Sequence, residues 1–272
     1  MMLITVLTLL ALWRVMAAHP PGTAEHVRQG GSLRVGFAPE APYAFYDADG
    51  EVTGEAPETF RLLARRMGIQ RIDWVRLDFA QLLPELQLGR IDAIASGLFI
   101  TPARQKLAVF SLPTARVRAA LVVRQGERRL PLRPTLESLR DPAPLQLATI
   151  HDAAENELLR GAGVGPQRIV SIPGAQRALQ AVQESTVDAF AISAVTARHL
   201  VAQHPGEALE VRTLVDAPPG LPAFAFRLDD TDLRDAMNQQ LARFLGTQEH
   251  RQLVERFGFS IDELPPSAQG AP

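Results

Sequence analysis

Phe99, Thr101 and Arg104 lie within six residues of one another, directly after the apolar segment Ile91–Ser96. That segment alternates like a half-buried strand, and in open α/β sheets ligands bind beyond the carboxyl ends of the strands. A guanidinium presents a planar fork of donors that matches a carboxylate, so Arg104 is a candidate clamp for a ligand carboxylate. The alternative is a surface ion pair, which is the commoner role of a single arginine after a strand.

Two more predicted strands end near residues that could hold a cation. The segment Leu33–Phe37 is followed by the loop P-E-A-P-Y, in which two prolines stiffen the backbone that displays Glu40 and Tyr43. Phe79 stands at the end of the next predicted strand, Ile72–Leu77. Three aromatic rings, one acid and one arginine at neighbouring strand ends would suit a zwitterion, because ring faces attract a delocalised cation. The alternative is that the three rings are ordinary core residues.

The second half of the chain alternates between predicted strands and helices, which indicates a parallel sheet with helices on both faces. The strands are expected over residues 145–150, 168–172, 187–192 and 209–214. The first helix begins near Asp152, after a turn whose free N–H groups suit an anion. Thr149, Asp152 and Gln176 are therefore candidate ligand contacts. The alternatives are helix capping for Asp152 and simple exposure for Gln176.

Composition narrows the classes of function. The chain has 272 residues, a net charge of -2 and 46% hydrophobic residues, so it contains one or two globular domains and no basic field for nucleic acid. With no cysteine, it lacks disulfides, thiolate zinc sites, cysteine nucleophiles and the lipid-bearing cysteine of a lipoprotein. Its six histidines are scattered, and neither a G-x-S-x-G elbow nor a phosphate loop occurs. We therefore expect no catalytic residue, no metal and no cofactor.

The two ends of the chain differ from its middle. Residues 1–18 form an apolar segment that ends in small residues, which predicts a signal peptide although Arg14 interrupts it. An upstream start or an uncleaved anchor are the alternatives, but a spanning helix needs ~20 apolar residues. Residues 19–31 are expected to be a flexible mature N-terminus and residues 265–272 a frayed tail.

A longer pattern surrounds Arg104. The sequence L-x-P-x-L-x-x-G-x-x-D-x-I-x-x-G begins at Leu82 and is followed by T-x-x-R and then F-S. It resembles the signature of the family 3 extracellular solute-binding proteins of ABC uptake systems, and the likeness runs from about Leu33 to Phe259. The resemblance implies a periplasmic, monomeric binder that delivers its ligand to a membrane permease, with Thr101 and Arg104 on the ligand carboxylate.

The resemblance also implies the fold of a type II periplasmic binding protein, with two doubly wound α/β lobes joined by a two-strand hinge. Prolines and changes of pattern place the boundaries: residues 32–117 plus 218–264 would form lobe 1, and residues 118–217 would form lobe 2. Two crossovers between lobes make a hinge, and closing it would bury a ligand from water.

The segments P-E-A-P-Y, G-E-A-P-E and F-I-T-P-x-R together resemble the ectoine and hydroxyectoine binding branch of this family. In that branch an acid and three aromatic rings surround the cyclic amidinium, and an arginine holds the carboxylate. The matching positions are Glu40, Tyr43, Phe79, Phe99 and Arg104.

Ser193 separates this chain from many amino-acid binders, which carry an aspartate for the α-ammonium after the corresponding strand. A serine cannot neutralise an ammonium, and Glu40 is the only obvious acid beside the rings, so a diffuse cation is favoured. Two alternatives remain: a polar or basic amino-acid binder, and a cyclohexadienyl (prephenate or arogenate) dehydratase on the same fold. In the dehydratase Glu40 would protonate a leaving hydroxyl.

Overall fold

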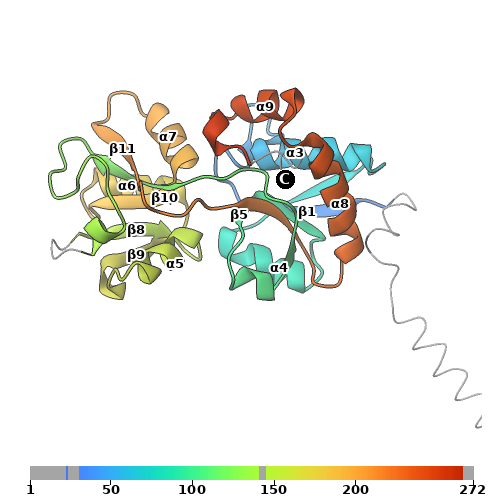
Figure 1. Ribbon diagram of the computed structural model, residues 1–272, viewed down its shortest axis with the longest axis horizontal. Helices are drawn as coiled ribbons and strands as arrows, with labels where there is room; N and C mark the ends of the chain where they lie inside the picture. The colour runs from blue at the N-terminus through green and yellow to red at the C-terminus, as the bar shows by residue number, and fades with distance from the viewer. Residues whose placement is uncertain (1–22, 24–30, 141–144, 266–272) are drawn as a thin grey trace, which may run out of the picture.

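A computed structural model describes residues 23, 31–140 and 145–265 of the chain (Figure 1). The predicted signal peptide, 1–18, lies outside the described residues, as do most of the predicted N-terminal segment, 19–31, and of the predicted tail, 265–272. No helix in the described ranges combines the length and the apolar character that crossing a bilayer requires. The described residues form two α/β lobes, as predicted.

Lobe 1 is built on a five-stranded sheet in the order β4-β1-β5-β12-β6. Its strands are β1 (Leu33–Phe37), β4 (Ile72–Arg76), β5 (Ala93–Phe99), β6 (Val109–Phe110) and β12 (Pro222–Phe226). The other elements of the lobe are the hairpin of β2 (Phe45–Tyr46) and β3 (Val52–Thr53) and the helices α3 (Glu55–Arg66), α4 (Leu82–Gln87), α8 (Thr231–Phe244) and α9 (Gln248–Glu255).

Helix α3 illustrates how the sequence determines these elements. Phe60 and Leu63 on its apolar stripe are fully buried, and the ring of Phe60 meets that of Phe224 in β12 edge to face at 5.0 Å. Acids in the first turn and arginines in the last complement the helix dipole. The helix stops before Gly68, whose positive φ of 82° is the left-handed conformation that glycine adopts most easily. These local signals account for where the helix begins and ends.

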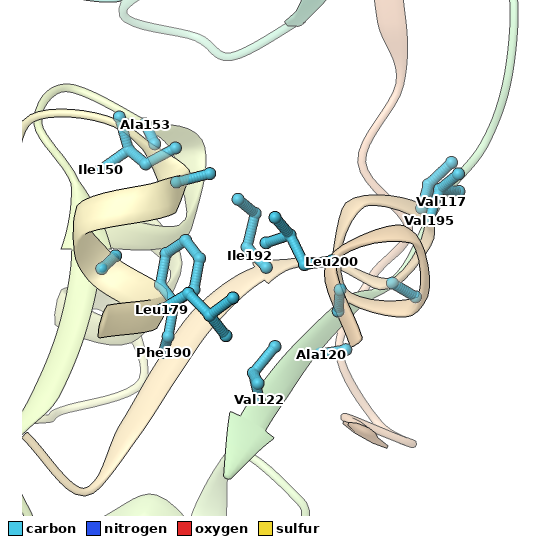
Figure 2. Packing of buried hydrophobic residues seen from close by; sticks show 14 of the residues in the cluster. Val117, Ala120, Val122, Ile150, Ala153, Leu179, Phe190, Ile192, Val195 and Leu200 are labelled. Atoms are coloured by element: carbon cyan, nitrogen blue, oxygen red, sulfur yellow. The ribbon is translucent and has the colours of Figure 1, made fainter. Parts of the chain in front are cut away.

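Lobe 2 contains a second five-stranded sheet in the order β11-β7-β10-β8-β9. Its strands are β7 (Ala119–Arg124), β8 (Leu147–Ile150), β9 (Ile169–Ile172), β10 (Ala189–Ser193) and β11 (Leu209–Thr213). Its helices are α5 (Ala154–Gly161), α6 (Ala175–Gln183) and α7 (Ala194–Ala202). Figure 2 shows the apolar side chains packed between this sheet and its helices, among them Phe190, Ile192, Leu179 and Leu200.

One strand in each sheet runs opposite to the other four. Strand β12 is antiparallel to both β5 and β6, and β7 is antiparallel to both β10 and β11. Both reversed strands are the first strand that the chain forms after crossing from the other lobe. The four strands predicted for lobe 2 do share one direction, and β7, which was not among them, runs opposite to them between β10 and β11.

Two extended segments, 111–118 and 214–221, connect the lobes (Figure 1). Val117 and Gly220 hold the segments together through reciprocal backbone hydrogen bonds of 2.9 and 2.7 Å. A side chain at Gly220 would collide with the ring of Phe99, because a Cβ there would lie 2.4 Å from that ring. The hinge thus packs directly on a candidate site residue. We retain 32–117 plus 218–264 and 118–217 as the proposed boundaries of the lobes.

Candidate functional site

The carboxyl ends of β1, β4 and β5 meet at one edge of the lobe 1 sheet, because the three strands are parallel neighbours. Glu40 follows β1, Phe79 begins a 3-10 turn after β4, and Phe99 ends β5. The loop that carries Glu40 is closed by two backbone hydrogen bonds between Glu40 and Ala44, of 2.7 and 3.0 Å. The fold therefore brings together side chains that are far apart in the sequence.

These residues face lobe 2 across a small space that we call the central cavity. Its volume is about 20 Å³, room for about one water molecule. Five predicted contacts line it, namely Glu40, Tyr43, Phe79, Phe99 and Arg104. The lobe 2 residues that line it are Ile150, Ala153, Ala154, Glu155, Ala191, Ile192 and Ser193. The two lobes are thus closed on each other, and a larger ligand requires them to separate or the lining side chains to move.

Arg104 is buried, with only 6% of its surface exposed. Its Nη1 donates to the carbonyl oxygen of Phe99 at 2.7 Å, and its Nη2 donates to the carbonyl oxygen of Asp152 in lobe 2, also at 2.7 Å. The guanidinium carbon lies 5.4 Å from the centroid of the Phe79 ring. No carboxylate of the described residues pairs with Arg104, so the surface ion pair is not its role here. Burial lowers the pKa of Arg104, and the negative charge of Glu155 opposes that shift.

Tyr43 and Phe99 serve the core as well as the cavity. Both are buried in an apolar cluster that continues into lobe 2, and their rings meet edge to face at 6.2 Å. The Tyr43 ring also meets Phe259 at 5.5 Å. Gly97 makes room for Tyr43, because a Cβ at Gly97 would lie 2.4 Å from the tyrosine ring. Phe79 differs from both in being only half-buried.

A chain of hydroxyl groups connects Glu40 to lobe 2. The Oγ1 of Thr196 donates to Oε1 of Glu40 at 2.9 Å, and the Oγ of Ser193 donates to that Oγ1 at 3.0 Å. Ser193 also caps α7 by accepting from the backbone N–H of Thr196 at 3.2 Å. The pKa of Glu40 is raised to about 7, because burial and the charge of Glu155 both raise it and the Thr196 hydrogen bond only partly opposes them.

Glu155 is a site residue that the sequence did not reveal. It is the second residue of α5, it is only 7% exposed, and it lines the central cavity. The expectation that Glu40 is the only acid beside the rings is therefore wrong. Acids are common in the first turn of a helix, so neither the residue type nor the position of Glu155 indicated a site residue. Burial raises the pKa of Glu155, while its own backbone N–H and Arg104 lower it.

The remaining predicted contacts do not line the central cavity. The Oγ1 of Thr101 accepts from the backbone N–H of Arg104 at 3.3 Å, so Thr101 positions the arginine. The fully buried Thr149 accepts at Oγ1 from Asn156 at 3.2 Å. Asp152 contributes its backbone oxygen to Arg104, and its side chain is exposed. Gln176 is exposed in the first turn of α6, away from the central cavity.

Two larger cavities adjoin the central one, and Phe79 borders all three. The first, of about 370 Å³, is lined by Glu40, Phe79, Ile150 and His151 among others. The second, of about 400 Å³, is lined by Phe79, Arg104 and Asp152 among others. Spaces of this size accommodate small ligands. Glu40 therefore lines both the first of these spaces and the central cavity, and Arg104 lines both the second space and the central cavity.

The described residues contain no group of three or more histidine, aspartate or glutamate side chains that could hold a metal ion. The charged side chains that line the central cavity are Glu40, Arg104 and Glu155. Together with three rings they give the central cavity both positively and negatively charged side chains.

Comparisons with known proteins show similarity in sequence and in fold. Residues 33–260 match the model of the bacterial extracellular solute-binding proteins, family 3. A probable amino-acid ABC transporter periplasmic-binding protein of Sinorhizobium fredii is 29% identical over 260 residues, covering 92% of this chain and 83% of the relative. The lysine/arginine/ornithine-binding periplasmic protein of Escherichia coli is 35% identical over 126 residues, 46% of each chain. The solved structure of EhuB in complex with hydroxyectoine has a TM-score of 0.80 at 28% identity, covering 88% of this chain and 92% of that one.

Proposed function

This chain belongs to the bacterial extracellular solute-binding proteins of family 3, and from that premise we propose that it binds ectoine or hydroxyectoine between its lobes. The ligand would be a small zwitterion with its carboxylate on Arg104 and its amidinium among the rings, facing Glu40. The chain would act in the periplasm as a monomer and deliver the ligand to the membrane permease of an ABC transporter. The periplasmic and amino-acid ABC transport relatives support that role.

One observation carries the choice of ligand. Glu40, Tyr43, Phe79, Phe99 and Arg104 line a single cavity, and the buried guanidinium has no carboxylate partner among the described residues. A buried guanidinium whose hydrogen bonds go to backbone oxygens favours a ligand that supplies a carboxylate, since charge-assisted hydrogen bonds are stronger away from water. The rings favour a delocalised, weakly hydrated cation at the other end of the ligand. The hydroxyectoine complex of a 28% identical protein supports the same class.

A basic amino acid is the second candidate, because Glu155 adds a second acid to the cavity. Two carboxylates would suit a ligand with two cationic groups and one carboxylate. The relative named for lysine, arginine and ornithine supports this candidate over less than half of the chain.

We further propose that the chain is not catalytic. A carboxyl group with a pKa of about 7, like that of Glu40, has the acidity of a general acid, so the dehydratase alternative needs a direct test. Purified protein incubated with prephenate or arogenate should leave both unchanged. Formation of their decarboxylated aromatic products would overturn the proposal.

A thermal-shift screen of the full chain separates the ligand classes. Ectoine and hydroxyectoine should raise the melting temperature more than glycine betaine, arginine, lysine or glutamine at equal concentration, because only a ligand that binds the folded state stabilises it. The same screen on Arg104→Ala should show no shift with the ectoines. Stabilisation by arginine or lysine alone would transfer the proposal to the second candidate.

A further inference from the structure

The central cavity contains more acidic than basic side chains. Glu40 from lobe 1 and Glu155 from lobe 2 supply two carboxyl groups, and Arg104 supplies one cation, among the described residues that line it. Glu155 and Arg104 are only 7% and 6% exposed. Burying an uncompensated charge is unfavourable. The closed site is therefore neutral only when it takes up a proton or an additional cationic group.

Glu155 faces few groups that could compensate its charge. Strands β8, β9 and β10 pack against α5 and carry no titratable side chain. Across the cavity the titratable groups that interact with Glu155 are Arg104, Glu40 and the phenol of Tyr43. The titratable groups on its own helix and on the preceding turn, all exposed, are Glu157, Arg160, His151 and Asp152. Arg104 and Glu155 form no ion pair, but Arg104 is the cation whose charge acts on Glu155, and a ligand carboxylate would compete for it.

We propose that Glu155 determines the net charge of the ligand that the closed site accepts. The lobes close on a zwitterion only when one proton is taken up from solvent as well. Glu40 and Glu155 hold that proton between them. This inference rests on the proposed function, because it assumes that the ligand carboxylate meets Arg104 on the side of Glu155. The proton binds to a carboxyl oxygen, and no other bond is made or broken. A ligand with an additional cationic group supplies this positive charge itself, so its binding requires no proton uptake.

The structure offers a matched control. Glu249 is the second residue of α9, as Glu155 is of α5, and both helices have eight residues. The side chain of Glu249 is 52% exposed and pairs with Arg66 at 2.5 Å. Glu155→Gln and Glu249→Gln therefore make the same chemical change at the same helical position, one inside the cavity and one at the surface.

The test is calorimetric titration of the full chain with hydroxyectoine between about pH 5.5 and pH 9, in two buffers with different ionisation enthalpies. For the unaltered protein the dissociation constant should rise with pH, at most about tenfold per pH unit for one proton, and the buffer dependence should show proton uptake. Glu155→Gln should bind with little pH dependence and more tightly than the unaltered protein at pH 9. Parallel pH profiles for the unaltered protein and Glu155→Gln would overturn the inference.

Urea unfolding without ligand keeps the role of Glu155 testable if hydroxyectoine proves to be the wrong ligand. Because burial raises the pKa of Glu155, the unaltered protein should lose stability relative to Glu155→Gln as the pH rises above about 4.3, whereas Glu249→Gln should not show this gain. No signal in any of the three proteins with hydroxyectoine, and none with ectoine, would overturn the proposed ligand. Equal pH dependence of unfolding in the unaltered protein and Glu155→Gln would overturn the role given to Glu155.

Discussion

Arg104 of lobe 1 donates a 2.7 Å hydrogen bond from Nη2 to the backbone oxygen of Asp152 in lobe 2, so the proposed carboxylate clamp also holds the lobes together. Asp152 has a positive φ of 59°, a conformation that is uncommon outside glycine. A guanidinium has five N–H donors, and the two bonds to Phe99 and Asp152 leave others free. A ligand carboxylate can therefore join Arg104 without undoing the contact between the lobes.

Arg104→Ala should weaken ligand binding by at least ~2 kcal/mol, about thirtyfold, because a charged hydrogen-bond partner is lost in a desolvated site. Arg104 is also buried, and its hydrogen bond to Asp152 joins the two lobes. We therefore also expect a lower melting temperature in the absence of ligand.

Arg90→Ala is the control for that experiment. Arg90 is an exposed arginine of the same lobe that forms a 2.8 Å ion pair with Glu85. Exposed pairs contribute only about 0 to 1 kcal/mol, so this variant should bind and melt almost normally. Unchanged affinity in Arg104→Ala for every ligand that stabilises the unaltered protein would remove Arg104 from the site.

Phe79→Ala should weaken binding by about 1 to 3 kcal/mol, through lost apolar burial and lost attraction between ring and cation. Phe257→Ala is a matched control, because Phe257 is also half-buried and has the guanidinium carbon of Arg256 5.6 Å from its ring, outside the central cavity. Equal losses of affinity in the two variants, measured by calorimetry, would show that Phe79 acts only through general stability.

Thr196→Val should raise the pKa of Glu40 above about 7, because the hydroxyl that stabilises its carboxylate is removed. The carboxyl carbon of Glu40, followed by NMR during a pH titration, reports this change. Thr186→Val is the control, since Thr186 is exposed and its Oγ1 donates to the backbone oxygen of Ala181 instead. A Glu40 pKa that stays the same or falls in Thr196→Val would contradict the hydroxyl chain.

Glu55, which does not line the central cavity, predicts a second pH dependence. It begins α3, it is fully buried, and burial raises the pKa of its carboxyl to about 7. Because the pKa of Glu55 is raised in the folded state, its contribution to stability is complete below the unfolded pKa of about 4.3. That contribution is lost as the pH rises to about 7. Glu55→Gln should therefore gain stability relative to the unaltered protein across that range in urea unfolding. Glu58→Gln, which removes a partly exposed acid of the same helix, should not reproduce the gain.

Much of the fold could be predicted because local signals agree with one another. The alternation of Leu33–Phe37 gives β1 with the predicted bounds, and Gly68 and Gly89 occupy the left-handed conformation expected where helices end. The grouping of Glu40, Phe79 and Phe99 followed from one rule, that parallel neighbouring strands end at the same edge. The reversed direction of β7 could not be predicted this way, because it depends on how the chain crosses between lobes.

The burial of the site residues was harder to predict than their grouping. Charged side chains are mostly exposed, yet the two hydrogen bonds of Arg104 to backbone oxygens allow it to be buried between the lobes. Glu155 and Glu249 occupy the same position in their helices, but only the tertiary structure places one in the cavity and the other at the surface. In the sequence, Ser193 was interpreted only as the replacement of an aspartate. In the structure it caps α7 and is connected to Glu40 through the hydroxyl group of Thr196.

Calorimetric titration of the full chain with ectoine, hydroxyectoine and arginine at pH 7 tests the central proposal most directly. We expect saturable heat with one binding site per chain for at least one of the two ectoines, little or no heat with arginine, and loss of the ectoine signal in Arg104→Ala. Saturable binding of arginine together with no heat from either ectoine would contradict the proposal. The rings would then be walls of an amino-acid pocket, with Glu40 and Glu155 as the partners of a basic ligand.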